Sequence, residues 1–416
     1  MQVRIHRGTR EIGGTCIELV HEGARILLDL GLPLDGDPGD ASCHPVVDGM
    51  AGGGDLKALI LSHGHRDHVG LAHLAGPDLP VVMGAATQAI LTAVAPFVPD
   101  AYLPPSTITI ENGKPLTFGP FTVTPTLVDH SAYDAYALLV EAGGQRLFYS
   151  GDFRGHGRKA SLFERFIRHP PKNIDLLLLE GSSLGRLDPD QRFPTESDVE
   201  DRFVSLFQDT AGIALVAASA QNIDRMVSLY RACKRSGRTL VIDLYAAEVL
   251  RATGNANIPQ SDWPCMAVFV PHYQRVRIKQ TGRFDLLEAH AANRIFPEHL
   301  RAMAPRAAFL FRPAMLRDLD RAECLSGATA IWSQWDGYLA QERGLALQAD
   351  LTERGIPLTH AHTSGHASIP DLKRLAEAIA PRRIVPIHTF HADGFPELFG
   401  PSVSIKQDGQ WWEIAA

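Results

Sequence analysis

The sequence predicts an α/β protein of two domains, one of which is inserted into the other. In residues 3–179, short apolar segments alternate with turns rich in Gly, Pro and Asp, and helices are expected only near 67–74 and 85–94. This pattern is typical of a sheet-rich αββα sandwich. From residue 196, strands and helices alternate, which predicts βαβ units and a parallel sheet.

The pattern of the first region resumes after about residue 345. Helices are expected over 347–354 and 370–380, and strands over 358–360 and 383–388. We therefore expect residues 1–195 and 346–416 to form the first domain and residues 196–345 to form the insertion. Thr195-Glu-Ser-Asp198 is typical of a helix N-cap and marks the start of the insertion.

Each expected strand is a short apolar or β-branched run bounded by turn residues. In the first domain these runs are 16–20, 25–29, 56–61, 81–83, 107–111, 118–127, 137–141, 146–150 and 174–179. In the insertion, the expected strands are 213–217, 239–243, 266–270, 307–311 and 328–333, and the expected helices include 222–236 and 246–253.

The most informative motif is Leu61-Ser-His-Gly-His-Arg-Asp-His-Val-Gly70, directly after an apolar strand. Imidazole nitrogen and carboxylate oxygen are ligands that zinc-like cations prefer, and burying four such groups without a cation would be costly. His63 and His65 lie two apart on an extended segment and point the same way, whereas Asp67 and His68 open the next helix. Two pairs on two sides of one turn favour two metal ions.

The H-x-H-x-D-H pattern resembles the signature of the metallo-β-lactamase superfamily. The further residues that this family requires occur in order beside expected strands, namely Asp29, His130, Asp152 and His388. The resemblance implies that one divalent metal is held by His63, His65 and His130, and the second by Asp67, His68 and His388. Asp152 would bridge the two, and Asp29 would orient a ligand histidine or the turn. Zn²⁺ is the expected metal, and such a mixed nitrogen and oxygen set also accepts Mn²⁺.

Three later segments resemble motifs A, B and C of the β-CASP group, which are metallo-β-lactamase-fold nucleases with a cap domain. They are Leu176-Leu-Leu-Leu-Glu180, His362-Thr-Ser-Gly-His366-Ala-Ser and Pro386-Ile-His388. Ser-Gly-His-Ala-Ser and residues 8–14 look most like ribonuclease J and its relatives. In the wider group, histidine at motif C is associated with RNA.

This resemblance assigns roles to residues outside the metal ligands. His366 would donate a proton to a phosphate oxygen or to the leaving oxygen, and Glu180 would hold His366 protonated and correctly turned. Asp67 counts as a catalytic candidate as well as a ligand. The expected phosphate and nucleotide contacts are Ser364, Gly365, Ala367, Ser219, Asn222 and Arg225.

The chain departs from the ribonuclease J pattern in two places. Thr-Phe-His follows His388 where Gly-Glu is more familiar, and residues 389–416 do not contain that family's C-terminal assembly domain. We expect a specialised relative, with a homodimer as one option for its assembly.

The expected function is metal-dependent hydrolysis of single-stranded RNA to 5′-phosphate products, by 5′-to-3′ exonuclease action or, as the runner-up, internal cleavage. The alternatives are a DNA nuclease of the same group and a small-molecule thioester or lactone hydrolase. A non-catalytic protein would be expected to lack ligands, and a flavodiiron protein usually has Glu at the position of His65. Two sets of basic residues could contact a phosphate backbone. One set is at 225, 231, 234, 235 and 238; the other is at 275, 277 and 279, where alternating residues would share one face of a strand.

Composition is consistent with a cytoplasmic enzyme. Hydrophobic residues make up 45% of the chain, and no apolar run approaches the ~18 residues of a membrane span, so no membrane partner is expected. The start lacks the apolar core of a signal peptide. The five cysteines are scattered without a CxxC motif, which favours reduced thiols. The net charge of −7 gives no general indication of a polyanionic partner.

Overall fold

The computed structural model describes residues 1–52, 54–98 and 107–414, and these residues form two compact units. The described residues of Met1–Thr92, Tyr102–Phe193 and Gly365–Ala416 form the first unit. Those of Ala93–Ala101 and Pro194–Ser364 form the second unit. The main segment of the second unit, Pro194–Ser364, therefore lies in sequence between two segments of the first unit.

The C-terminal boundary of the insertion differs from the prediction. We expected residues from 346 onward to return to the first domain, but the second unit continues to Ser364. The reason is strand β18 (Leu358–His360), which pairs in parallel with β17 (Thr329–Trp332) of the inserted sheet. Helix α11 (Glu342–Glu353), which leads to β18, packs its Leu347 and Leu351 into the core of the second unit.

The first unit contains two sheets. The first has the strand order β20-β1-β2-β3-β4-β5-β6, with β1 Gln2–Arg7, β2 Cys16–His21, β3 Ala24–Leu28, β4 Leu56–Ile60, β5 Val81–Gly84, β6 Thr107–Ile110 and β20 Trp411–Glu413. The second has the order β19-β11-β10-β9-β8-β7, with β7 Leu116–Phe118, β8 Phe121–Val128, β9 Ala135–Ala142, β10 Gln145–Tyr149, β11 Leu176–Glu180 and β19 Arg383–Ile387. The C-terminal segment thus contributes a strand to each sheet.

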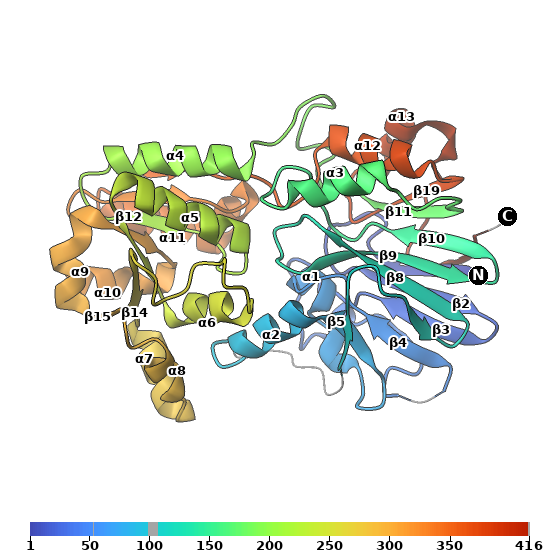
Figure 1. Ribbon diagram of the computed structural model, residues 1–416, viewed down its shortest axis with the longest axis horizontal. Coiled ribbons are helices and arrows are strands. Elements are labelled where there is room, and N and C mark those ends of the chain that lie inside the picture. The colour runs from blue at the N-terminus through green and yellow to red at the C-terminus, as the bar shows by residue number, and fades with distance from the viewer. Residues whose placement is uncertain (53, 99–106, 415–416) are drawn as a thin grey trace. The chain divides into compact units, whose positions relative to one another are not determined.

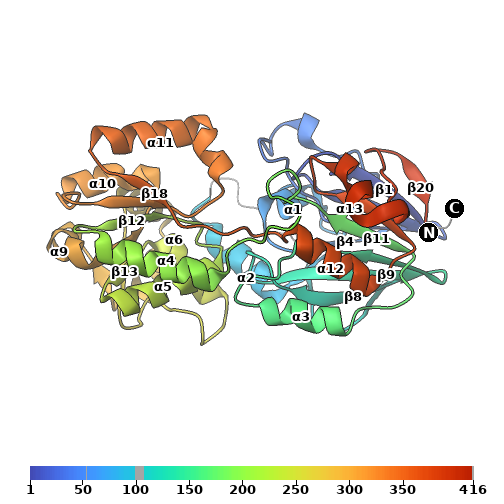
Figure 2. The ribbon, with the colours of Figure 1, turned by 90° about the horizontal axis from the view of Figure 1, so that it is seen from above.

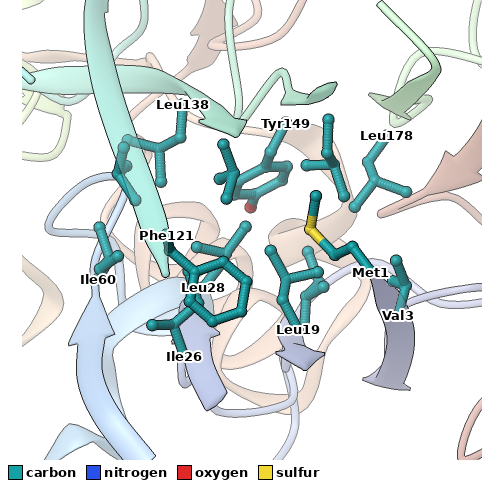
Figure 3. Packing of buried hydrophobic residues seen from close by; sticks show 14 of the residues in the cluster. Met1, Val3, Leu19, Ile26, Leu28, Ile60, Phe121, Leu138, Tyr149 and Leu178 are labelled. Carbon is teal, nitrogen blue, oxygen red and sulfur yellow. The ribbon is translucent and has the colours of Figure 1, made fainter. Parts of the chain in front are cut away.

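Three buried apolar clusters define the layers of the first unit. The central cluster joins the facing surfaces of the two sheets, and Figure 3 shows Leu19, Ile26 and Leu28 of the first sheet near Tyr149 and Leu178 of the second. A second cluster fills the outer face of the second sheet, between that sheet and helices α3 (Ala160–Arg168) and α12 (Ile369–Ile379). Figure 1 shows these two helices along that face of the sheet. The third covers the outer face of the first sheet, beside α1 (Arg66–Val69). This arrangement confirms the predicted αββα sandwich.

Strand direction determines where polar residues can gather. Strands β8 and β10 are both antiparallel to β9, whereas β10, β11 and β19 are mutually parallel. The carboxyl ends of β8, β10, β11 and β19 therefore lie along one edge of the second sheet. In the first sheet, β3 and β4 are parallel and also share an edge. Residues just after these strands can converge even though they are far apart in sequence.

The second unit is built on a parallel sheet, as the sequence predicted. Its order is β15-β14-β13-β16-β12-β17-β18, with β12 Ala214–Ala217, β13 Thr239–Ile242, β14 Met266–Phe269, β15 Arg294–Ile295 and β16 Ala307–Leu310. Figure 2 shows α4 (Glu196–Asp209) and α5 (Ile223–Ser236) on one side of this sheet and α11 on the other. Among the described residues, no helix is both long and apolar enough to cross a membrane.

Several helices were not expected from the sequence. They include α3, α7 (His272–Thr281), α8 (Asp285–Ala289), α9 (Pro297–Met303), α10 (Leu316–Arg321) and α13 (Phe395–Phe399); the structure also contains α2 (Ala85–Val94) and α6 (Leu244–Ala252), which were expected. Because α7 is a helix, the alternating Arg275, Arg277 and Lys279 do not share one face as they would on a strand. The expected strand 118–127 is instead the end of β7, a turn and β8.

Candidate active site

Most of the predicted metal ligands follow a strand at the edges just described, and the other two lie in a short helix. His63 and His65 follow β4, and Asp67 and His68 lie in the short helix α1. The other three each follow a strand of the second sheet: His130 after β8, Asp152 after β10 and His388 after β19. Both sheets therefore contribute ligands to one place in the first unit.

The seven side chains lie in two groups. Within each group, the candidate ligand atoms lie within 4.8 Å of one another. One group consists of His63, His65 and His130, and the other of Asp67, His68, Asp152 and His388. His65 Nδ1 lies 3.1 Å from His130 Nε2. Asp152 Oδ2 lies 3.7 Å from Nε2 of both His63 and His388, so this carboxylate faces both groups.

Buried polar atoms without partners show that the site fits cations. His63 Nε2, His388 Nε2 and Asp152 Oδ1 are inaccessible to solvent and have no hydrogen-bond partner among the described residues. Leaving such atoms unsatisfied would cost about 1–3 kcal/mol each, and more where a charge is involved. Divalent cations bind imidazole nitrogen and carboxylate oxygen, so cations at this place would supply the missing partners of these atoms.

Asp29 contacts both a predicted ligand ring and the backbone before the motif. Its Oδ2 lies 2.8 Å from His68 Nδ1, and its Oδ1 accepts a hydrogen bond from the Ser62 amide at 2.6 Å. Ser62 and Tyr149 donate their hydroxyls to Oδ2 at 2.8 and 2.5 Å. Asp29 is fully buried. It therefore fixes the ring of one ligand and the backbone that leads into the H-x-H-x-D-H turn.

Other predicted ligand rings are held by Ser62 and Thr15, which the sequence did not indicate, and by Gly365, for which the sequence suggested a substrate contact instead. His63 Nδ1 lies 3.0 Å from Ser62 Oγ, and His388 Nδ1 lies 3.0 Å from Thr15 Oγ1. His130 Nδ1 lies 2.6 Å from the carbonyl oxygen of Gly365. Ser62 is inside the motif and could have been considered, but no local signal connects Thr15 or Tyr149 with the metal site.

Two site residues have left-handed backbone conformations. Asp29 has φ +58° and His388 has φ +52°. For a residue other than glycine this conformation costs on the order of 1 kcal/mol or more. Backbone hydrogen bonds hold both residues in place, from Asp29 N to Ile60 O at 2.9 Å and from His388 N to Gly8 O at 2.6 Å. These turns bend the chain sharply where each strand ends and help place the side chains at the site.

Burial and neighbouring charges set the protonation of the ligands. Burial lowers the pKa of His65 to about 4, and it holds the pKa values of His63 and His130 well below the usual range. These three rings are therefore neutral near pH 7, which is the form that binds metal. Burial also opposes charge on His68, but Asp152 and Asp29 outweigh it and raise its pKa. A cation bound there would displace that proton.

Next to the ligands lies the pair formed by His366 and Glu180. His366 Nδ1 is 3.1 Å from Glu180 Oε2, 2.8 Å from Ser182 Oγ and 3.7 Å from Asp152 Oδ2. Glu180 ends β11 and is fixed by the Phe153 amide, which donates to its Oε1 at 2.9 Å. Burial opposes charge on His366, but Glu180 and then Asp152 outweigh it and raise the pKa. Ser182 was not identified from the sequence.

The predicted substrate contacts divide between the units. In the first unit, Gly365 is closely packed, since a Cβ there would lie 2.4 Å from Ser131 Oγ, and Ala367 has its side chain in a buried apolar layer. In the second unit, Ser219 is exposed, Asn222 caps α5 and Ser364 is buried. Among these residues, Ser219 is the one whose side chain is exposed.

Arg225 does not present its charge to solvent as the sequence suggested. Its side chain is fully buried and forms an ion pair with Glu196 at 3.1 Å. Two other members of the basic cluster, Arg231 and Arg235, form ion pairs with Glu200, and Arg238 donates to four backbone carbonyls, including Phe207 O and Ala307 O. Partners within the fold therefore offset much of the positive charge of this cluster.

Replacing one ligand tests the metal assignment. His68→Ala removes a predicted ligand whose ring contacts both Asp152 and Asp29, so metal content after purification should fall below that of the wild type. The matched control is His290→Ala, a buried histidine of the second unit that lies 2.6 Å from Glu248. Metal per chain is measured by elemental analysis. Full metal content in His68→Ala would exclude this residue as a ligand.

Comparisons with known proteins agree with this geometry. Residues 25–201 match a β-lactamase superfamily domain, and residues 359–393, which include His366 and His388, match a Zn-dependent metallo-hydrolase RNA specificity domain. A crystal structure of a protein of unknown function from Enterococcus faecalis V583 has a TM-score of 0.80, with 21% identity and 99% of both chains covered. That structure supports the fold of both units.

Curated relatives carry the name ribonuclease J. The protein of Mycobacterium tuberculosis H37Rv is 25% identical, covering 92% of this chain and 67% of its own length. That of Sinorhizobium meliloti is 23% identical, covering 87% and 64% respectively, so this chain spans about two thirds of the length of these relatives. The expectation of a metal-dependent hydrolase with this fold is confirmed. The chain thus contains a β-lactamase superfamily domain and an RNA specificity domain of Zn-dependent metallo-hydrolases, and it is similar to ribonuclease J over most of its length.

Proposed function

We propose that this protein is a metal-dependent nuclease that hydrolyses single-stranded RNA to products with a 5′ phosphate. The observation that carries the proposal is the position of His366, whose Nδ1 is held by Glu180 while lying 3.7 Å from Asp152 of the metal cluster. A proton donor thus stands beside a cation site. The match of residues 359–393 to an RNA specificity domain supports RNA as the substrate.

The metal cluster has the donors that hydrolysis of a phosphodiester requires. Five histidines and two aspartates would hold two divalent cations, which when bound supply activation of water and neutralisation of phosphate charge. We propose Zn²⁺, because the set is rich in imidazole. The protein keeps His63, His65 and His130 neutral by burying them. It orients the rings of His68, His63 and His388 through Asp29, Ser62 and Thr15.

His366 supplies the proton for the leaving group. Cleavage of the bond between phosphorus and the 3′ oxygen leaves the phosphate on the 5′ end of the downstream product, and the departing 3′ oxygen must gain a proton. The raised pKa of His366 keeps it protonated closer to neutral pH, mainly because Glu180 outweighs the effect of burial. Glu180 also fixes the side of the ring that carries Nδ1.

The direction of degradation is part of the proposal. We propose 5′-to-3′ exonuclease action, with internal cleavage as the runner-up, because the segment around Ser219 and Asn222 resembles the nucleotide pocket of ribonuclease J. The structure leaves the side chain of Ser219 exposed, whereas Arg225 is engaged elsewhere. Action in the cytoplasm is proposed because all five cysteines are free thiols. Assembly as a homodimer is a further proposal.

Labelled substrates separate this proposal from its alternatives. The metal-loaded protein is incubated with 5′-labelled single-stranded RNA, single-stranded DNA of the same sequence, a blunt duplex and a panel of thioesters. We expect the single-stranded RNA to be degraded fastest and its products to carry 5′ phosphates. Products ending in a 5′ hydroxyl, equal cleavage of the duplex, or turnover of thioesters alone would contradict the proposal.

A substitution at His366 separates proton donation from metal binding. His366→Ala should keep its metal and much of its affinity for RNA but lose about 10²–10⁴-fold in rate, which is the usual effect of a positioned acid. The rate is measured under single-turnover conditions, beside metal content and RNA binding. Loss of metal together with activity would instead make His366 a ligand.

Glu180→Gln tests the electrostatic role of the carboxylate. A raised histidine pKa means that the proton, and with it acid catalysis, is lost as pH rises through that pKa. Removing the negative charge of Glu180 should lower the pKa, so the alkaline limb of the rate profile should move to lower pH. Single-turnover rates across the pH range measure this shift. An unmoved alkaline limb would show that Glu180 does not set the protonation of His366.

A further inference from the structure

The Arg225 guanidinium joins segments of the second unit that are far apart in sequence. Its Nε and one terminal nitrogen donate to the Glu196 carboxylate at 3.2 and 3.1 Å, and Glu196 is the first residue of α4. The same terminal nitrogen donates to Thr363 O at 3.3 Å, and the other donates to Ser333 O at 2.9 Å. Arg225 has an exposed fraction of 0% and Glu196 of 1%.

Two further hydrogen bonds attach the same segments to each other. Thr363 Oγ1 donates to Pro194 O at 2.5 Å, and Ser333 Oγ donates to Ala361 O at 2.5 Å. Arg225 also lies 3.3 Å from His362 Nδ1. Residues 361–363 are therefore bound to the start of α4 and to the end of β17 by a continuous buried network centred on Arg225.

The network joins the two ends of the inserted segment, close in sequence to the active-site residue His366. Pro194 is the first residue of the inserted segment and Ser364 is the last. Gly365, which follows, receives the hydrogen bond from the ligand His130, and the next residue is His366. The short stretch from Ala361 to His366 is thus anchored at one end by Arg225 and at the other by the active site.

The chemistry of Arg225 suits this role and that of lysine does not. A guanidinium is a planar fork that can bond a carboxylate through two nitrogens and still reach two carbonyls. An ammonium is a single point of charge that cannot span the same partners. Burial of this charge is compensated because Glu196 is beside it, and every contact that holds it lies within the second unit.

We propose that Arg225 is a positioning residue for His366. It binds the start of the inserted segment to its end, so that residues 361–364 lead in one conformation to Gly365 of the first unit, where the chain continues to His366 beside Glu180 and Asp152. This inference rests on the proposed function, since it concerns the residue that donates the proton there. It replaces the direct phosphate contact that the sequence suggested for Arg225.

The structure offers a matched control for the test. Arg238 is also buried in the second unit, where its guanidinium donates to Phe207 O, Gly212 O and Ala307 O at 2.8–2.9 Å and to Thr210 O. Arg238→Lys therefore removes a buried guanidinium with a similar number of hydrogen bonds, at a place that does not contact residues 361–364. A second test variant with a smaller change is Thr363→Val, which removes the hydrogen bond to Pro194 O. Its control is Thr210→Val, which removes a hydrogen bond to Leu206 O.

Two measurements are made on the full metal-loaded variants. Hydrogen exchange of peptides covering 190–198 and 358–368 reports on the network without any need for activity. Steady-state kinetics on single-stranded RNA report on His366. For Arg225→Lys we expect faster exchange in these peptides and a fall in kcat of about 10²-fold, with KM and metal content close to wild type. Thr363→Val should show the same changes in a weaker form, and neither control should show them.

Each outcome bears on the inference. Unchanged exchange at 358–368 in Arg225→Lys, or an equal loss of kcat in Arg238→Lys, would overturn it, because the effect would then be absent or a matter of general stability. Should Arg225→Lys fail to fold, Thr363→Val against Thr210→Val decides by the same readouts. A wild-type protein without nuclease activity would refute the proposed function, and exchange would still show whether Arg225 holds the segment.

Discussion

The structure depends on the convergence of seven largely buried side chains whose atoms could bind metal. Two carboxylates and five imidazoles lie in two groups whose ligand atoms are within 4.8 Å of one another, and His63 Nε2, His388 Nε2 and Asp152 Oδ1 have no partner in the described protein. Without cations, burial of these polar and charged groups would be costly. If cations were bound, these groups would coordinate them, and the coordination would link both sheets at one edge.

The fold makes this convergence possible through strand direction. The parallel strands β10, β11 and β19 end along one edge, and β8 ends there too because β8 and β10 are both antiparallel to β9; β3 and β4 end together in the other sheet. Asp29 then connects the layers, because it accepts hydrogen bonds from Ser62 after β4 and from Tyr149 at the end of β10. The inserted unit leaves this arrangement intact, since the chain returns at Gly365 to supply His366 and His388.

Much of the site was predictable because its residues are concentrated in local patterns. The H-x-H-x-D-H turn, and single polar residues after apolar strands, are visible without coordinates. The parts that were not predicted depend on distant partners. Tyr149 lies 120 residues from Asp29, and the partner of Arg225 lies 29 residues before it, so neither pairing leaves a local signal. The late boundary was missed because β18 has only three residues and is defined by its pairing with β17.

The central claim is that the two groups of ligands hold two cations joined by Asp152. The most direct test is a crystal of the protein purified without added metal, measured on both sides of the zinc absorption edge. The account predicts two anomalous peaks, one bonded to His63, His65 and His130 and the other to Asp67, His68 and His388, with Asp152 in contact with both. A metal-rich crystal with a single peak, or with peaks away from these residues, would contradict it.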